Sequence, residues 1–284
     1  MNETIIKSRD NALARRARGV REGRVQGQIF IEGLRLATEA ARAALDIEHV
    51  ICTEQFAHDE RGAQLFPLLG KARGRIALVS ESVFASLSDT KSPQGIVMLA
   101  ARPHTGRAAL EQPATATPLL VVMHLLNNPS NAGAILRAAE AAGATGAATT
   151  AGTTDIFSPR ALRGAMGSSF RLPLWTGAGF AEIMDWCKRR GIRAVASDLR
   201  ATRTQTEIDW TIASALVVGS EANGLARAEA ATIDERVRIP MRPPVESLNV
   251  AVASSVLLYE AARQRDARLR HADTEARRLD AEVK

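Results

Sequence analysis

Short apolar runs alternate with helix-like stretches in the first hundred residues. The runs contain β-branched residues, which is typical of strands, and they cover residues 28–31, 47–52, 76–79 and 95–100. An Ala-rich stretch at 33–45 and a shorter stretch at 80–87 predict helices, the second with Ser80 or Ser82 as its N-cap. The pattern therefore predicts a small α/β domain.

A second and more regular alternation begins at Leu119 with the apolar run LLVVMHLL. Further strands are expected at 146–150, 193–197, 215–219 and 237–239, and helices at 132–142, 158–164, 180–190, 225–231 and 249–268. Strands that alternate with helices in this way predict an open parallel sheet with helices on both faces.

The segment between the two alternations, RPHTGRAALEQPATATP, carries three prolines and three threonines and is the best candidate for a linker. We expect a first domain at 1–103, a linker at 104–117 and a second domain at 118–270. The charged residues 271–284 are expected to form a polar tail that frays.

The chain carries a net charge of +6, from 32 Arg and 5 Lys against 31 acidic residues. The excess of arginine has two explanations, a GC-rich genome or the recognition of phosphates by guanidinium groups. Residues 1–24 hold seven basic and three acidic residues, which fits either a solvated helix face or a contact with RNA. Aromatic residues make up only 4%, which argues against a surface that stacks bases.

Several classes of protein are excluded by what the sequence lacks. Cys52 and Cys187 are far apart and lie outside any CxxC or Cys/His cluster, so neither a disulfide scaffold nor a zinc site is expected. There is no signal-peptide apolar region and no apolar run of membrane-spanning length, so we expect a cytoplasmic protein. The sequence also lacks GxGxxG, GxxxxGK[ST], HExxH and GxSxG, so nicotinamide enzymes, P-loop ATPases and α/β-hydrolases are without their main signatures.

Three segments of the second domain carry the candidate chemistry. The first, NNPSNAGAILRAAEAAG, follows the apolar run at Leu119 and leads into a helix that is expected to begin near Asn131, with Arg137 in its first two turns. An ordinary strand–helix turn with an Asn cap would explain this segment. However, it lies beyond the carboxyl end of a parallel strand, which is where open α/β sheets place their sites.

The second and third segments follow later strands. In LVVGSEANGL, an apolar strand runs into a turn that is bracketed by Gly219 and Gly224 and holds Glu221. In RIPM…VESLNVAVASSVLLYEA, either Ser247 or Asn249 is expected to cap the closing helix. Capping does not explain why the apolar Leu248 lies between these two polar residues.

The three segments, in this order and spacing, resemble the SpoU/TrmH family of RNA ribose 2′-O-methyltransferases in the SPOUT superfamily. The resemblance covers about residues 118–265, and SPRALRGAMGSSFRLPL within it is also similar to the family. Residues 25–100 resemble, more diffusely, the L30e-like substrate-binding domain that often precedes such domains. The resemblance implies a SPOUT-type open parallel sheet with a deep C-terminal trefoil knot behind a small L30e-like α/β domain.

The resemblance also implies a cofactor and a site. S-adenosylmethionine would be held by positions that match Gly219, Ile239 and Leu248. Catalytic and substrate-positioning residues of the family match Asn131, Arg137, Glu221, Ser247 and Asn249. Arg137 cannot act as a free base because guanidinium stays protonated, so we expect it to clamp a phosphate and stabilise the developing alkoxide. Glu221 fits either a structural role in its turn or a contact with RNA.

The family resemblance favours structured RNA as the substrate, with 23S ribosomal RNA preferred over tRNA because of the front domain. It also implies a homodimer formed through the knotted region, for which the apolar closing helix is suited. The alternatives are a tRNA 2′-O-methyltransferase and a non-catalytic RNA-binding or ribosome-assembly protein on the same fold. Methylation that confers antibiotic resistance is a further variant of the leading function.

Overall fold

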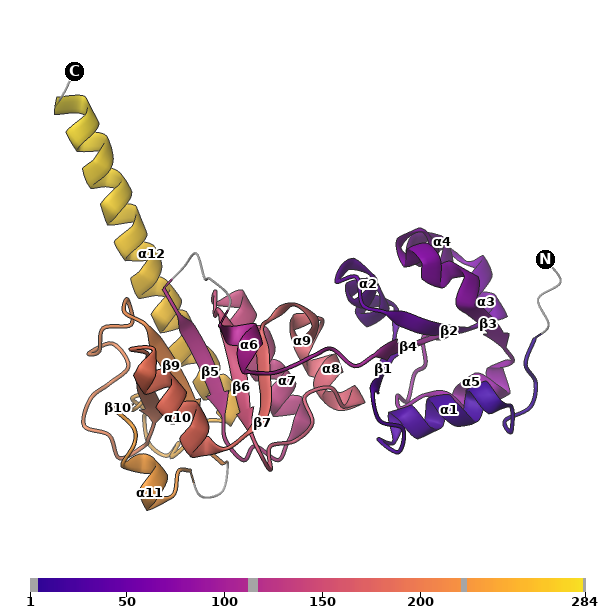
Figure 1. Ribbon diagram of the computed structural model, residues 1–284, viewed down its shortest axis with the longest axis horizontal. Coiled ribbons are helices and arrows are strands. Elements are labelled where there is room, and N and C mark those ends of the chain that lie inside the picture. The colour runs from indigo at the N-terminus through magenta and orange to yellow at the C-terminus, as the bar shows by residue number, and fades with distance from the viewer. Residues whose placement is uncertain (1–4, 112–116, 221–223, 283–284) are drawn as a thin grey trace. The chain divides into compact units, whose positions relative to one another are not determined.

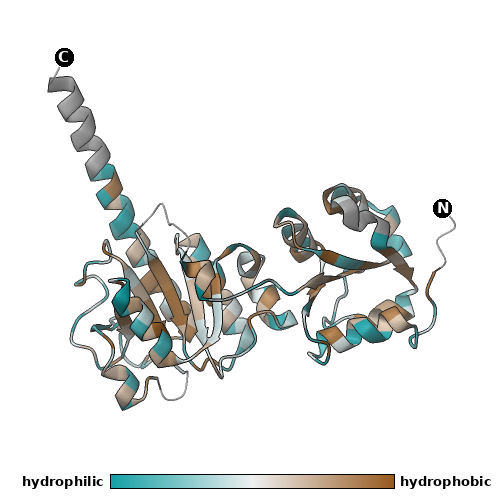
Figure 2. Ribbon diagram, viewed as in Figure 1, coloured by the Kyte–Doolittle hydropathy of each residue, from teal (hydrophilic) through white to brown (hydrophobic). Residues whose placement is uncertain are grey.

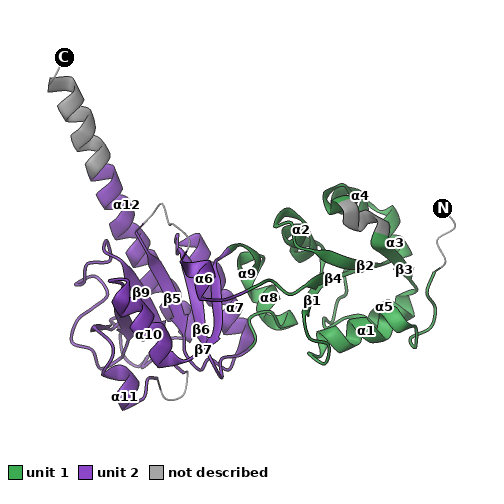
Figure 3. Ribbon diagram, in the orientation of Figure 1, with its two compact units in different colours: residues 1–104, 155–171 green, residues 105–154, 172–284 purple. Residues whose placement is uncertain are grey.

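The computed structural model describes residues 5–111, 117–220 and 224–282, with side chains of 71–74 and 272–282 left aside. The chain divides into two compact units, which Figure 3 shows in green and purple. Unit 1 comprises residues 1–104 together with 155–171, and unit 2 comprises residues 105–154 and 172–284.

Unit 1 is built on a four-stranded mixed sheet with the order β1-β4-β2-β3. Its strands are β1 (Gln28–Glu32), β2 (Ile47–Thr53), β3 (Ile76–Val79) and β4 (Ile96–Ala101). β4 pairs antiparallel with both β1 and β2, whereas β2 and β3 are parallel. Ile6 extends the sheet beyond β3, because its N–H donates to the carbonyl of Leu78 and its carbonyl accepts from Ser80. All four expected strands are thus present within one or two residues of their expected ends.

Helices of unit 1 cover the sheet on both sides (Figure 1). They are α1 (Ala12–Arg21), α2 (Leu34–Arg42), α3 (Glu54–His58), α4 (Glu60–Leu65), the 3-10 segment η1 (Phe66–Arg75) and α5 (Glu81–Leu87). Ser80 caps α5 through its side chain, as expected. The sequence pattern did not predict α3, α4 and η1, which are short and are broken at Asp59 and Gly70.

The basic N-terminal segment folds as α1, and several of its arginines have partners within unit 1. The guanidinium of Arg21 donates to the carbonyls of Ser86, Leu87 and Ser88, at the C-terminus of α5. Arg18 donates to the hydroxyl of Ser86 and to the carbonyl of Arg9. Arg21 thus satisfies carbonyl groups at the end of α5 that have no partner within the helix. The charge of these arginines therefore serves the fold of unit 1.

Residues 155–171 belong to unit 1 although they follow strand β6 (Gly146–Thr150) of unit 2 in the chain. They contain α8 (Pro159–Ala165) and α9 (Ser168–Arg171). Arg163 on α8 lies 3.7 Å from the carboxylate of Glu32 and 2.7 Å from that of Asp89. The Glu32 side chain is only 3% exposed and also accepts hydrogen bonds from the Asp89 N–H and the Thr90 hydroxyl. A buried ion pair of this kind requires its partners, because either charge alone would be left desolvated.

Unit 2 is built on a six-stranded parallel sheet with the order β10-β8-β9-β5-β6-β7. Its strands are β5 (Leu119–Met123), β6 (Gly146–Thr150), β7 (Leu174–Ala178), β8 (Arg193–Ser197), β9 (Ser214–Val218) and β10 (Glu235–Val237). The central strands are fully buried, which explains their continuous apolar runs, and Figure 2 shows these strands in brown.

The helices of unit 2 are α6 (Arg107–Leu110), α7 (Pro129–Ala141), α10 (Phe180–Arg189), α11 (Arg227–Ala230) and α12 (Val250–Glu282). Leu120 and Val122 pack on the side of α10, together with Trp175 and Trp186. Since side chains alternate along a strand, Val121 and the other odd positions of β5 face the opposite side, where α7 and α12 pack against each other and the sheet.

The second unit departs from the expected pattern at β7, at α6 and at the end of α12, among other places. β7 was not expected, because Pro173, Gly177 and Gly179 make its sequence look like a loop. α6 occupies part of the expected linker, of which 112–116 lie outside the described residues. α12 does not end near 268 but continues to Glu282, because the expected tail is rich in Ala, Leu, Arg and Glu, which are strong helix formers.

Candidate functional site

A pocket of about 570 Å³ lies at the carboxyl edge of the unit 2 sheet. Its walls come from the ends of β8 and β9, from the segments after β10 and from the first turns of α12. Gly219, Ile239 and Leu248, the three expected cofactor-binding residues, all line this pocket, and so do Ser247 and Asn249. Five sequence-predicted positions from two distant segments are therefore brought to one cavity.

Gly219 is required by a close approach of two backbone segments. Ser220 and Gly224 form a bridge in which the Gly224 N–H donates to the Ser220 carbonyl at 2.9 Å. A Cβ atom on Gly219 would lie 2.7 Å from the carbonyl carbon of Gly224, which is closer than real side chains come to backbone. Gly224 itself has a φ of +62°, the left-handed region that glycine favours. The two glycines make one tight turn in the wall of the pocket.

Asn131 and Asn249 meet at this edge although 118 positions separate them in the chain. The side-chain N–H of Asn249 donates to the side-chain carbonyl of Asn131 at 3.2 Å. Asn249 is the cap of α12, since its side-chain oxygen accepts from the N–H groups of Ala251 and Val252. Of the two candidate caps, Asn249 rather than Ser247 thus fills the role.

The helix after β5 begins earlier than expected, and this changes the role of Asn131. α7 starts at Pro129 and its cap is Asn128, whose side chain accepts from the N–H groups of Ser130 and Asn131. The Asn131 side chain is therefore not used in capping and reaches Asn249 instead. Proline at the first helical position suits the helix start, because its missing N–H would have no partner there.

Arg137 lies at the start of the third turn of α7 and is exposed. No hydrogen bond or ion pair holds its guanidinium within the described part of the chain, and it is not among the residues that line the pocket. A protonated guanidinium without an internal partner is available for an external anion. Glu221 lies outside the described residues, so its role stays a prediction.

A histidine and a glutamate that the motif analysis did not assign also lie at this edge. His124 directly follows β5, is 4% exposed and packs edge-on against Phe180. Its Nε2 lies 3.1 Å from a carboxylate oxygen of Glu229 on α11, and its Nδ1 lies 3.0 Å from the Thr150 hydroxyl. The other carboxylate oxygen of Glu229 accepts from the Ala226 N–H at 2.8 Å. The one sequence feature that could have indicated this contact is the polar His124 inside the apolar run LLVVMHLL.

Other kinds of chemistry find less support among the described residues. Cys52 and Cys187 are both buried and neither forms a disulfide, and burial raises the pKa of the Cys187 thiol to about 12. A protonated, inaccessible thiol is a poor nucleophile. Within the described ranges no group of three His, Cys, Asp or Glu could hold a metal ion, and no helix is long and apolar enough to cross a bilayer.

Comparison with known proteins agrees with this geometry. Residues 118–259 match the SpoU rRNA Methylase family, and residues 11–98 match the MRM3-like substrate binding domain. The chain is 31% identical over 243 residues to a 23S rRNA (guanosine-2′-O-)-methyltransferase of a Burkholderia species, with 84% of this chain and 98% of that protein covered.

Two solved structures share the arrangement of most of the chain. An RNA 2′-O ribose methyltransferase has a TM-score of 0.77 and 32% identity, with 92% of this chain and 99% of the other covered. The SpoU methyltransferase AviRb from Streptomyces viridochromogenes, in complex with the cofactor AdoMet, has a TM-score of 0.79 and 26% identity, with 90% and 98% covered. In that relative, the fold holds S-adenosylmethionine.

Proposed function

Since the chain belongs to the SpoU rRNA methylase family, we propose that it transfers the methyl group of S-adenosylmethionine to a ribose 2′-hydroxyl of ribosomal RNA. The observation that carries this proposal is the meeting of Asn131 and Asn249 at the rim of a pocket lined by Gly219, Ile239 and Leu248. The expected substrate is 23S rRNA, and the expected site of action is the cytoplasm.

The pocket fits S-adenosylmethionine in size and in lining. Its volume of about 570 Å³ lies in the range of small-molecule sites. Gly219, Ile239 and Leu248 offer backbone groups and apolar surface, and the close approach of Gly224 leaves no room for a side chain at Gly219. When bound, the cofactor supplies an electrophilic methyl group on a positively charged sulfur.

The residues of the chain have to position the ribose and allow the proton of its 2′-hydroxyl to leave. The 2′-hydroxyl is a weak nucleophile at neutral pH and loses its proton as it attacks. Arg137 is exposed and has no internal partner among the described residues, so it can form a bidentate contact with the phosphate next to the target ribose. In that position it holds the nucleotide and stabilises the negative charge that develops on the ribose oxygen, while a phosphate oxygen or water takes the proton.

Asn131 and Asn249 fix the other side of the site. Their amide pair joins the start of α7 to the start of α12, so the segment before Arg137 and the segment with Ser247 and Leu248 keep a constant spacing. The second side-chain N–H of Asn249 can bind a ribose hydroxyl or phosphate. Glu221 is proposed to order its turn by accepting backbone N–H groups.

The decisive experiment maps ribose methylation in rRNA and tRNA from the wild-type and a deletion strain. We expect one 2′-O-methylated nucleotide of 23S rRNA to disappear in the deletion strain and to return when the purified protein and S-adenosylmethionine are added. Loss of a methyl group in tRNA alone would replace the rRNA proposal with the tRNA alternative. If no site is lost and the protein fails to bind S-adenosylhomocysteine, the non-catalytic RNA-binding alternative holds.

Unit 1 and α12 are the parts of the chain that we propose contact its partners, RNA and a second copy of the protein. We propose that the L30e-like part of unit 1 binds structured RNA, that residues 118–270 carry the reaction, and that 104–117 link them.

On α12, Val252, Val256 and Tyr259 form an exposed apolar stripe at helical spacing, with 50%, 37% and 56% of their surface accessible. Such a stripe supports a homodimer formed through the second domain. In sedimentation experiments we expect the wild type to be a dimer and Val256→Glu to be a monomer. A wild-type protein that sediments as a monomer would contradict the proposed dimer.

A further inference from the structure

The pocket carries an excess of positive charge that the cofactor does not account for. Among the described residues that line it, Arg200, Arg236 and Arg238 are basic and Asp198 is the one acid. S-adenosylmethionine carries two positive charges, on sulfur and ammonium, and one negative charge, on its carboxylate. One carboxylate on a net cationic molecule cannot balance three arginines, so this charge is suited to a second, anionic ligand.

Arg200, Arg236 and Arg238, which we call the basic rim, are only weakly satisfied within the chain. Asp198 lies 3.4 Å from Arg200 and 3.7 Å from Arg236, so one carboxylate is shared by two guanidinium groups. The Arg200 side chain is 89% exposed and that of Arg236 is 50% exposed. No hydrogen bond or ion pair of the Arg238 guanidinium occurs in the part of the chain that the structure describes. Each group can thus bind an anion without breaking a strong internal contact.

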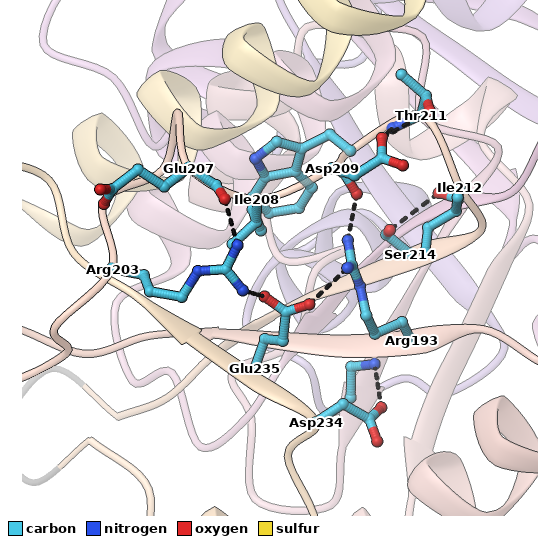
Figure 4. Close-up of polar contacts among 12 residues, drawn as sticks. Arg193, Arg203, Glu207, Ile208, Asp209, Thr211, Ile212, Ser214, Asp234 and Glu235 are labelled. Atoms are coloured by element: carbon cyan, nitrogen blue, oxygen red, sulfur yellow. Dashed lines mark hydrogen bonds and ion pairs between the residues drawn. The ribbon is translucent and has the colours of Figure 1, made fainter.

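A neighbouring network of ion pairs holds the basic rim in place. Figure 4 shows Arg193 and Arg203 converging on Glu235, at 2.5 and 2.7 Å. The Arg238 N–H donates to the Arg203 carbonyl at 2.9 Å, which holds the segment after β8 against the end of β10. Because side chains alternate along a strand, Arg236 points away from the side on which Glu235 is neutralised.

The position and chemistry of the basic rim favour RNA phosphates. β10 is the last strand of the sheet, and residues 203–205 pair with Arg238 beside its end, so the basic rim lies at the border of the sheet. The pocket lining contains no aromatic residue among those described, so bases have no stacking surface there. Guanidinium groups bind phosphates in a bidentate manner. We propose that the basic rim binds the phosphodiester backbone of the substrate RNA beside the target nucleotide, as a second contact in addition to Arg137. This inference rests on the proposed function.

The test separates RNA binding from cofactor binding. The binding of an unmodified 23S rRNA transcript is measured against KCl concentration for Arg200→Gln, Arg236→Gln, Arg238→Gln and the triple variant, and S-adenosylhomocysteine binding is measured by calorimetry. We expect each single variant to weaken RNA binding several-fold and to reduce the slope of log K against log[KCl] by about 0.7–1. The triple variant is expected to reduce the slope by roughly 2–3. S-adenosylhomocysteine binding should change less than about twofold.

Arg189→Gln is the matched control. Arg189 ends α10 in the same unit, is exposed and does not line the pocket, so this variant removes the same charge and should leave both measurements unchanged. An equal loss of RNA affinity in Arg189→Gln would reduce the proposal to a general charge effect. Weaker S-adenosylhomocysteine binding with unchanged RNA binding would assign the arginines to the cofactor carboxylate and overturn the proposal. If the triple variant does not fold, the three single variants still test whether the basic rim binds RNA. Failure of the wild type to methylate any RNA would instead count against the proposed function.

Discussion

The amide of Asn249 makes contacts in two directions, donating to Asn131 at 3.2 Å and accepting from the N–H groups of Ala251 and Val252. One side chain thus caps the closing helix and joins it to the start of α7. The two roles use different atoms of the same amide, so they can be separated by substitution.

Asn249→Asp and Asn249→Ala separate these roles. An aspartate caps a helix about as well as an asparagine, so the melting temperature of Asn249→Asp should stay within about 2 °C of wild type. The variant loses the donor to Asn131, and we expect kcat/KM to fall at least about tenfold. Asn249→Ala loses the cap as well, about 1 kcal/mol, and should melt about 2–4 °C lower. Full activity of Asn249→Asp in a methyl-transfer assay would show that the contact with Asn131 is not needed.

Arg137→Lys tests whether the guanidinium fork matters. Lysine keeps the positive charge but cannot make a bidentate contact with phosphate. Single-turnover rates and RNA affinity should both fall, the rate by about tenfold or more. Because Arg137 is exposed and without a partner in the described chain, the melting temperature should not change. Near-wild-type turnover with unchanged RNA affinity would rule out the fork geometry.

Gly219→Ala should lose cofactor binding. The new Cβ would lie 2.7 Å from backbone of Gly224, so the turn in the pocket wall must move. We expect the Kd for S-adenosylhomocysteine to rise at least about tenfold in calorimetry. Gly179→Ala is the control, because Gly179 has a φ of −67° and the nearest atom to its Cβ is 3.8 Å away. Equal effects of the two substitutions would mean that the close approach is not the cause.

Glu229 is expected to position the pocket wall through His124 and the Ala226 N–H. Glu229→Ala removes both contacts and should raise the KM for S-adenosylmethionine about fivefold while kcat changes little. Glu229→Gln keeps an acceptor for Ala226, and the histidine can adopt the other tautomer to face the amide, so this variant should bind the cofactor nearly as wild type does. Glu182→Ala on α10 is an exposed control. A loss in Glu229→Gln as large as in Glu229→Ala would contradict the positioning role.

Cys187 makes stability depend on pH in the alkaline range. Burial raises its pKa from 9.0 to about 12. Between these values the unfolded thiol ionises while the folded thiol stays protonated, so the free energy of unfolding falls as the pH rises. This group contributes up to about 1.4 kcal/mol per pH unit. Denaturant titrations at pH 8 to 11 should show a smaller decline in Cys187→Ala, and iodoacetamide at neutral pH should modify the thiol only after unfolding.

Strongly patterned elements could be predicted from the sequence, because burial imposes the pattern. The run at Leu119 is a fully buried central strand, and all four strands of unit 1 are where short β-branched runs indicate them. β7 was missed because it lies near the sheet edge, next to Pro173 and Gly179, where local composition resembles a loop. The end of α12 was misplaced because charge was interpreted as fraying, although the same residues favour helix.

The site was predictable only in part for a related reason. Gly219, Ile239 and Leu248 were expected from the family resemblance, and all three line one pocket. The contact of Asn131 with Asn249 could not be predicted, because it depends on where α7 begins. Asn128 caps this helix, so the Asn131 side chain is left to reach Asn249. The pairing of His124 with Glu229 joins positions more than a hundred residues apart and leaves no local pattern. Contacts of this kind follow from the fold alone.

The membership of residues 155–171 in unit 1 has a consequence for how the protein is made. Synthesis proceeds from the N-terminus, so residues 1–104 leave the ribosome before Arg163 exists. Until then the nearly buried carboxylate of Glu32 lacks the cation that lies beside it in the finished fold. Unit 1 therefore cannot complete its fold until residues 105–154 of unit 2 have also been synthesised. A chain cut after residue 104 is expected to fold less stably than the same sequence within the whole protein.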